Sequence, residues 1–272
     1  GARWELQSEL GNGATGVVFR AFDRATKEAI ALKVFAPTTG SHDWLARFGR
    51  EVKLARQLQH PNVCRVFDLV EVDGHRLLTM ELAERGSLRE TLDRETDRPF
   101  EMRLADARAV VAGIAAMHAI GIVHRDIKPE NILRRASGEL VVSDFGLAFE
   151  ADRKSRVTRH VGTPLYMAPE VALGEPATKR SDVFALGLVL HEVIFGKRPE
   201  LSEQAVRAGA TWTGGPKGEP AAVRALRILC FQCVAPRADD RPADAGVVAR
   251  RLEQIAQRSP LALRLFAIKW RR

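Results

Sequence analysis

Residues 124–131 read His-Arg-Asp-Ile-Lys-Pro-Glu-Asn, and the triplet Asp144-Phe145-Gly146 follows farther along the chain. These two stretches provide one candidate general base, Asp126, and two oxygen donors, Asn131 and Asp144, of the type that Mg²⁺ prefers. A positioned base beside metal ligands is the arrangement that phosphoryl transfer requires. The competing interpretation is that the two aspartates only cap turns, which is a common role of Asp in loops.

A glycine-rich stretch near the start of the chain supplies a second part of such a site. Residues 11–18 read Gly-Asn-Gly-Ala-Thr-Gly-Val-Val, and residues 17–21 continue as a strand-like run. Glycines let backbone N–H groups approach phosphate oxygens without obstruction from side chains. The same spacing opens dinucleotide-binding folds, but a helix follows it there, so the strand favours a different nucleotide site.

Lys33 lies in the apolar run 31–34, which reads Ala-Leu-Lys-Val. An ammonium group in such a run needs an anionic partner, although a lysine at a strand edge can also extend its charged end into solvent. The helical segment that follows, residues 43–59, carries Glu51 on its expected inward face. Glu51 is therefore the expected partner of Lys33, and Glu28 and Glu84 are weaker candidates.

The chain resembles the protein kinase family in a set of motifs that occur in the family's order: the glycine-rich stretch 11–18, Lys33, residues 124–131, residues 144–146 and Ala168-Pro169-Glu170. The resemblance covers nearly the whole chain, from about residue 10 to residue 251. It implies ATP as the phosphoryl donor, with Mg²⁺ as the metal and Mn²⁺ as an alternative.

The resemblance also assigns expected roles to residues. Asp126 is expected to be the base, and Lys128 to neutralise charge on the transferred phosphoryl group. Lys33, paired with Glu51, is expected to bind the α- and β-phosphates, and Asn131 and Asp144 to hold the metal. The other residues expected to contact ATP lie in the glycine-rich loop, the adenine pocket and the hinge: Leu10, Gly11, Asn12, Gly13, Ala14, Thr15, Gly16, Val17, Val18, Ala31, Met80, Glu81, Ala83 and Leu133.

Lys128, together with Gly162-Thr163-Pro164, resembles the serine/threonine branch of the family, so the expected substrates are proteins with Ser or Thr acceptors. The basic segment between residues 144 and 170 predicts autophosphorylation, with Arg125 as one receiver of the phosphate. The expected phosphosites are Ser155, Thr158 and Thr163. The alternative is a solvated basic loop, and a homodimer that phosphorylates in trans stays open.

Three further residues are implied to have structural roles. Asp182 resembles a helix aspartate that holds the catalytic loop, and Glu170 is expected to pair with Arg241 inside the helical lobe. An unpaired buried charge there would cost several kcal/mol. Residues 200–220 depart from the family, because they are short and rich in Gly, Ala and Pro where a docking helix is usual.

The pattern along the chain predicts an α+β, two-lobed fold. We expect a kinase domain over residues 4–258, with a small β-rich N-lobe at about 4–82 that has one main helix, a hinge at about 81–86 and a larger, mostly helical C-lobe at about 87–258. Helical periodicity extends over residues 104–120, 183–195 and 221–255. Residues 259–272 are expected to form a basic amphipathic tail.

Composition narrows the classes that remain. The 272 residues are 46% hydrophobic, which is enough for a substantial core, and the net charge of +8 is spread along the chain without an aromatic-interleaved basic stripe. We therefore expect no nucleic-acid partner. No apolar run approaches the roughly 18 residues of a membrane span. The chain starts without Met, so we expect a domain of a longer cytoplasmic protein, with a membrane tether outside this chain left open.

The chain has three cysteines, an odd number that fits a reducing compartment. Cys230 and Cys233 form a CxxC within a helical run, which favours buried structural thiols over a redox or metal site.

Three rival functions are a pseudokinase scaffold, a small-molecule phosphotransferase of kinase-like fold and a basic nucleic-acid binder. A pseudokinase would normally lack one of Lys33, Asp126 or Asp144, and all three are present.

Overall fold

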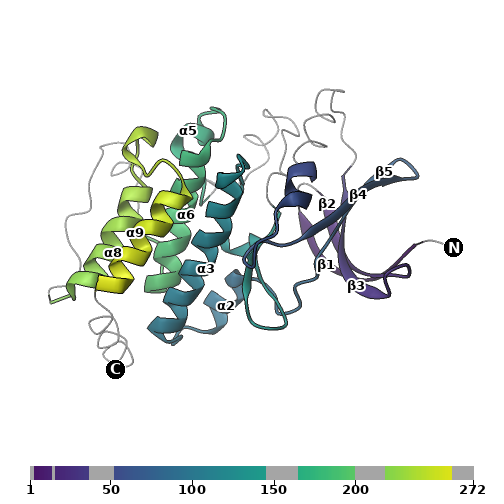
Figure 1. The fold of residues 1–272 in the computed structure, drawn as a ribbon, viewed down its shortest axis with the longest axis horizontal. Coiled ribbons are helices and arrows are strands. Elements are labelled where there is room, and N and C mark those ends of the chain that lie inside the picture. Colours follow the sequence, from purple (N-terminus) through teal and green to yellow (C-terminus); the bar gives the residue numbers. More distant parts are fainter. Residues whose placement is uncertain (1–2, 14–15, 37–51, 145–164, 200–217, 259–272) are drawn as a thin grey trace.

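The computed structural model describes residues 3–13, 16–36, 52–144, 165–199 and 218–258. Figure 1 shows a sheet at one end of the molecule and a larger group of helices at the other. The α+β, two-lobed architecture expected from the sequence is therefore confirmed.

The N-lobe is built on an antiparallel sheet with the strand order β1-β2-β3-β5-β4. Its strands are β1 (Trp4–Gly13), β2 (Gly16–Asp23), β3 (Glu28–Phe35), β4 (Val66–Val72) and β5 (His75–Met80). Asp73 and Gly74 both adopt positive φ, 50° and 76°, in the two-residue turn between β4 and β5. This backbone matches the twist of a tight hairpin and explains the Asp-Gly pair there.

The C-lobe contains most of the helices and a short two-stranded sheet. In chain order its elements are α2 (Leu88–Arg94), α3 (Phe100–Ala119), the 3₁₀ turn η1 (Pro129–Asn131), β6 (Ile132–Arg134), β7 (Leu140–Val142), α5 (Pro169–Ala172), α6 (Lys179–Phe195), α8 (Ala221–Cys233), the 3₁₀ turn η2 (Ala238–Asp240) and α9 (Ala245–Arg258). From Ser181 to Phe195 every residue of α6 is buried, so α6 is the central helix. Its ends are set by a Thr178–Ser181 capping box and by Gly196, which has a φ of 76°.

The helical pattern over residues 221–255 was only partly correct as a prediction. The structure divides it into α8 and α9, because the chain leaves the helical path after Cys233 and returns to it at Ala245. Pro236 and Pro242 stand between the two helices. A proline lacks the N–H that a continuing helix would need and clashes with the preceding turn.

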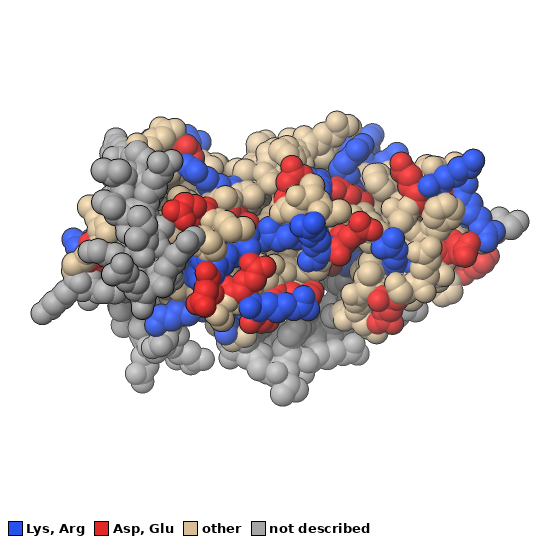
Figure 2. All heavy atoms as spheres, turned by 90° about the horizontal axis from the view of Figure 1, so that it is seen from below, with Lys and Arg blue, Asp and Glu red and all other residues tan. Residues whose placement is uncertain are grey.

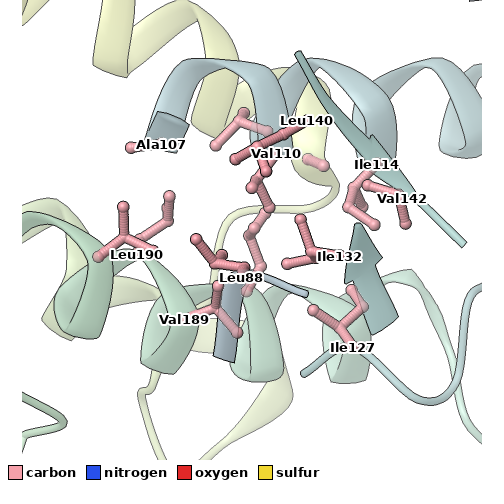
Figure 3. Close-up of a cluster of buried hydrophobic side chains, with 14 of the residues drawn as sticks. Leu88, Ala107, Val110, Ile114, Ile127, Ile132, Leu140, Val142, Val189 and Leu190 are labelled. Atoms are coloured by element: carbon pink, nitrogen blue, oxygen red, sulfur yellow. The ribbon is translucent and has the colours of Figure 1, made fainter. Parts of the chain in front are cut away.

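The core packs directly beneath the two candidate catalytic loops. In Figure 3, Ile127 of the first loop and Ile132 of β6 lie with Val142 of β7, Ile114 of α3 and Val189 of α6. All five side chains are at most 3% exposed. The loops that carry Asp126 and Asp144 are therefore anchored by apolar residues next to them in the sequence.

The three cysteines are free and buried, as expected for structural thiols. Burial raises the pKa of the Cys233 thiol to about 12 and raises that of Cys230 well above its usual value. Thiols that stay protonated are poor nucleophiles and poor metal ligands. Within the described ranges, no cluster of three or more His, Cys, Asp or Glu side chains could hold a metal ion.

Charges of both signs are interspersed on the face shown in Figure 2, where blue Lys and Arg side chains adjoin red Asp and Glu side chains. Ion pairs also form at the surface of the described residues, such as Arg89–Asp93 at 2.7 Å and Arg94–Glu90 at 3.1 Å. The net positive charge is thus not gathered into one patch on this face. Among the described helices, none combines the length and the apolar character that crossing a bilayer requires.

Truncating the core below the loops tests this account of the fold. Ile114→Ala removes a fully buried side chain and leaves a cavity, so we expect the free energy of unfolding to fall by about 2–5 kcal/mol in urea titrations. Leu173→Ala is the control, since Leu173 is 83% exposed and its truncation should change stability by no more than about 0.5 kcal/mol. Equal effects of the two changes would contradict the packing described.

Candidate active site

The carboxylate of Asp182, in the first turn of α6, holds the loop that begins at His124. Its two oxygens accept the backbone N–H groups of His124 at 2.6 Å and Arg125 at 2.8 Å. The imidazole Nε2 of His118 donates to the same carboxylate at 3.0 Å, because its Nδ1 already accepts the backbone N–H of Ala245. Asp182 is only 2% exposed, so its charge is stabilised by these donors rather than by water. The expected role of Asp182 in holding this loop is confirmed.

His124 joins the first catalytic loop to the strand that leads to Asp144. Its Nδ1 accepts the backbone N–H of Asp126 at 3.2 Å, and its Nε2 donates to the carbonyl oxygen of Ser143 at 3.0 Å. Burial lowers the pKa of His124, which fits a neutral ring with one donor and one acceptor. Ser143 in turn donates from its backbone N–H and its Oγ to the carbonyl of Asn131, at 2.8 and 2.9 Å.

Asp126 lies between an ammonium group and an amide. Lys128 Nζ donates to its Oδ2 at 2.8 Å, and Asn131 Nδ2 donates to the same oxygen at 2.9 Å and to the Asp126 carbonyl at 2.8 Å. Burial alone would raise the pKa of Asp126, but the charge and hydrogen bond of Lys128 outweigh it and the pKa is lowered. Asp126 is therefore ionised at neutral pH, and its side chain is still 42% exposed.

Lys33 connects the two lobes. It lies in β3, where it is opposite Val18 of β2 and Leu78 of β5, and its side chain is only 4% exposed. Its Nζ contacts Asp144 Oδ1 at 2.7 Å. The expected partner Glu51 lies outside the described residues, as do Phe145 and Gly146. Among the described residues, Asp144 is the carboxylate that pairs with Lys33.

The backbone is strained at two residues of the site. Arg125 and Asp144 have φ values of 71° and 58°, in the left-handed region that residues with a Cβ seldom occupy. Such conformations cost of order 1–3 kcal/mol and persist only where the surroundings impose them. The hydrogen bond from Arg125 N–H to Asp182 and the ion pair of Asp144 with Lys33 are the contacts that hold them here.

The glycine-rich stretch forms the ends of β1 and β2. Gly16 has a φ of 142°, and a Cβ on it would lie 2.1 Å from the carbonyl oxygen of Val34, so only glycine fits. A Cβ on Gly11 or Gly13 would meet nothing within 4 Å, so the fold itself does not require glycine there. Ala14 and Thr15 lie outside the described residues.

Met80 ends β5 and is 6% exposed, and the chain then runs to α2 through the expected hinge. Val18, Ala83 and Leu133 are partly buried against the main core, which also contains Ala31. They can therefore supply apolar surface to a flat ring. Leu10, by contrast, is 50% exposed near the end of β1.

Arg135 was missed by the sequence reasoning and connects the hinge to both lobes. Its guanidinium donates to the carboxylate of Glu81 and to the carbonyl oxygen of Pro61. Glu81 also accepts the backbone N–H of Arg65 at 3.2 Å. Arg135 follows β6 of the C-lobe by one residue and contacts a position 54 residues earlier in the chain. Local sequence patterns carry no signal for such a contact.

The expected pair of Glu170 and Arg241 is present. Arg241 donates two parallel hydrogen bonds to the carboxylate, at 2.7 and 2.9 Å, and its side chain is fully buried. It also donates to the carbonyls of Ala235 and Pro236. Burial would raise the pKa of Glu170, but the bonds from Arg241 outweigh it and the pKa is lowered. The pair fixes the segment around α5 to the C-lobe.

The structure thus brings Lys33, Asp126, Lys128, Asn131 and Asp144 into one connected group between a β-rich lobe and a helical lobe. A partly exposed carboxylate, two ammonium groups and two further oxygen donors in this setting are the set of groups expected of a bilobal phosphotransferase.

Comparison with known proteins identifies the family. The model of the protein kinase domain matches residues 4–212, and the chain belongs to the protein kinase family. It is 36% identical to serine/threonine-protein kinase PkaA of Streptomyces coelicolor, over 94% of this chain and 50% of that protein. It is 33% identical to serine/threonine-protein kinase PknL of Mycobacterium bovis, over 94% of this chain and 66% of that protein. The chain therefore spans from half to two thirds of the length of these relatives.

The Glu170–Arg241 pair makes a prediction about pH. Because the pKa of Glu170 is lower when folded, its contribution to stability is present above its ordinary value of 4.5 and is lost as the pH falls through the folded value. Glu170→Gln should therefore destabilise the protein at pH 7 and lose much of this effect in acid. Urea unfolding at several pH values measures the difference. Glu139→Gln, at a side chain that is 61% exposed, is the control and should change little at any pH. A Glu170→Gln effect that does not depend on pH would contradict the assignment.

Proposed function

We propose that this domain transfers the γ-phosphoryl group of ATP to Ser and Thr hydroxyls of proteins. The observation that carries the proposal is the ionised and partly exposed Asp126, held between Lys128 and Asn131. The names of the relatives as serine/threonine-protein kinases support the acceptor type. Because these relatives are longer than the chain, the substrates and partners of a whole protein are part of the proposal.

Asp126 orients the acceptor hydroxyl and takes its proton late in the transfer. A carboxylate with a lowered pKa is a weak base, so its main contribution is position, with proton acceptance once the oxygen–phosphorus bond has largely formed. Lys128, already within 2.8 Å of Asp126, carries the positive charge that stabilises the transferring group.

Asn131 and Asp144 are suited to hold Mg²⁺. Both hydrogen bonds that Asn131 donates go to Asp126, which leaves its amide oxygen as the group for a cation. Protein sites for Mg²⁺ commonly use one or two carboxylates and complete the shell with phosphate and water, so a larger acidic cluster is not needed. When bound, the metal neutralises phosphate charge. We propose that Lys33 would then leave Asp144 and contact the phosphates. In this nucleotide-bound state its carboxylate partner would be Glu51.

The remaining assignments follow the fold. We place the nucleotide between the glycine-rich loop and the hinge, with adenine against Val18, Ala31 and Leu133 and hinge backbone groups at Glu81 and Ala83. We extend the domain from residue 4 through α9 to residue 258, because α9 packs on α3 and α8. Residues 259–272 lie outside the described residues, and we assign them to a tail. The contacts of Lys33, Asp126 and Asp144 favour an enzyme over a scaffold.

Asp126→Ala tests the central role. Loss of a group that positions and deprotonates the acceptor should lower the rate of peptide phosphorylation by about 10²- to 10⁴-fold, with little change in the affinity for ATP. Radiolabel transfer from ATP to a Ser/Thr peptide mixture measures the rate, and nucleotide titration measures the affinity. Asp240→Asn is the matched control, because Asp240 is 61% exposed and lies in η2. Equal rates in the wild type and Asp126→Ala would remove Asp126 from its role.

Incubation of the purified chain with Mg-ATP should add phosphate to Ser155, Thr158 or Thr163. All three lie outside the described residues, and the prediction rests on the basic sequence around them and on Arg125 next to Asp126. Phosphosite mapping by mass spectrometry is the measurement, and Asp126→Ala protein should show no gain. A rate per molecule that rises with protein concentration would support transfer in trans. Active enzyme with no phosphate on these residues would disprove the regulatory proposal alone.

A further inference from the structure

A small cavity in the C-lobe lies away from the active site. It has a volume of about 60 Å³ and is enclosed by α2, the α2–α3 connection, α3 and the end of α6. Its lining includes Leu88, Leu92 and Val193, but also the side chains of Arg98 and Arg103. A water molecule needs about 10–15 Å³ measured in this way, so the cavity has room for more than one water or for one larger occupant.

Arg103 is 5% exposed, and one nitrogen of its guanidinium has no hydrogen-bond partner among the described residues. Its Nε donates to the carbonyl oxygen of Arg98 at 2.8 Å, and its Nη2 donates to the carbonyl oxygen of Thr96. Its Nη1 is buried, and no group of the described residues accepts a hydrogen bond from it. A Cβ placed on Gly196 would lie 2.8 Å from Nη1, so this nitrogen points to a cavity wall that only glycine leaves open.

Arg98 brings a second unused donor to the same cavity. Its Nη1 bonds to Glu95 and its Nη2 contacts Asp106 at 2.9 Å, but its buried Nε has no acceptor among the described residues. Leaving a charged donor buried without an acceptor costs free energy, and two such donors in one cavity indicate an occupant that accepts from both.

The charges around the cavity set the sign and size of that occupant. Glu95 and Asp106 are matched by Arg98 and by Arg134, which contacts Asp106 at 3.2 Å. No carboxylate in the described ranges forms an ion pair with Arg103, which distinguishes it from Arg98 and Arg134. Burial and the charge of Arg98 lower the pKa of Arg103, while the charge of Asp97 acts in the opposite direction. Glu95 and Asp106 would repel a divalent anion more strongly than a monovalent one, so a small monovalent anion fits this setting best.

We propose that this cavity is a binding site for a small monovalent anion such as chloride, held by Arg103 Nη1 and Arg98 Nε. The bound anion connects the α2–α3 loop to α3, next to Gly196 at the end of α6. This role is independent of the proposed phosphoryl transfer, because none of these residues belongs to the active site.

Bromide serves as the probe. In thermal unfolding at constant ionic strength, replacing sodium gluconate with sodium bromide should raise Tm, and the rise should grow with the logarithm of bromide concentration above the dissociation constant. Crystals soaked in bromide should show an anomalous-scattering peak within hydrogen-bond distance of both nitrogens.

Arg103→Met should abolish the bromide-dependent rise in Tm. Arg108→Met is the matched control, because Arg108 lies on the same helix, is 43% exposed and pairs with Glu253, so the rise should persist. A rise that survives Arg103→Met, water alone at the site, or a crystal peak without any response in solution would each overturn the proposal. If Arg103→Met does not fold, the wild-type titration and the anomalous map still decide between these outcomes.

Discussion

The active site depends on one buried carboxylate. Asp182 is removed from water, and its burial is tolerated because two backbone N–H groups and the Nε2–H of His118 replace the lost hydration. A loop cannot hold its own backbone as a helix or strand does, since it lacks a repeating pattern of hydrogen bonds. Asp182 supplies the missing acceptors at His124 and Arg125, two residues and one residue before Asp126. The left-handed backbone of Arg125 and the position of Asp126 both follow from that anchor.

From this anchor a chain of contacts extends to the other lobe. His124 connects the loop to Ser143, Ser143 precedes Asp144, and Asp144 holds Lys33 of β3 at 2.7 Å. Arg135 makes a second connection at the hinge, through Glu81. Backbone hydrogen bonds add to these side-chain contacts, since Cys64 N–H donates to the carbonyl of Val142 at 2.9 Å and Val142 N–H donates to the carbonyl of Asn62 at 3.0 Å. The lobes are thus joined at the hinge, behind the cleft and, through Lys33, at the proposed phosphate side.

Much of the fold and of the arrangement of the candidate site could be predicted from the sequence. What could and could not be predicted differs for a physical reason. Asp126, Lys128 and Asn131 occur in one short motif that resembles the family's, so their proximity in one loop could be expected from the sequence, and the structure shows it. Their catalytic roles stay predictions. Helical periodicity also located α3 and α6, but it extended one helix through Pro236 and Pro242. The contact of Lys33 with Asp144 and the role of Arg135 had no signal in local sequence patterns, because both depend on contacts across 54 residues or more. The predicted pairing of Lys33 with Glu51 stays a prediction, since Glu51 lies outside the described residues.

Several charged side chains lie inside the C-lobe, and their contacts indicate why. Apolar packing is enough to hold α3 and α6 in place, but it does not give an irregular segment one unique position. A directional hydrogen bond or ion pair to a charged side chain does give such a segment a unique position. Three irregular segments are each held by a buried or nearly buried charge on an adjoining element. Asp182 holds the loop at His124, Glu192 accepts from Tyr166 at 2.6 Å, and Arg241 binds Glu170. Replacing these charges with apolar side chains could preserve the stability of the lobe, but it would remove what places each segment. These three buried charges therefore serve mainly to position the segments that they contact.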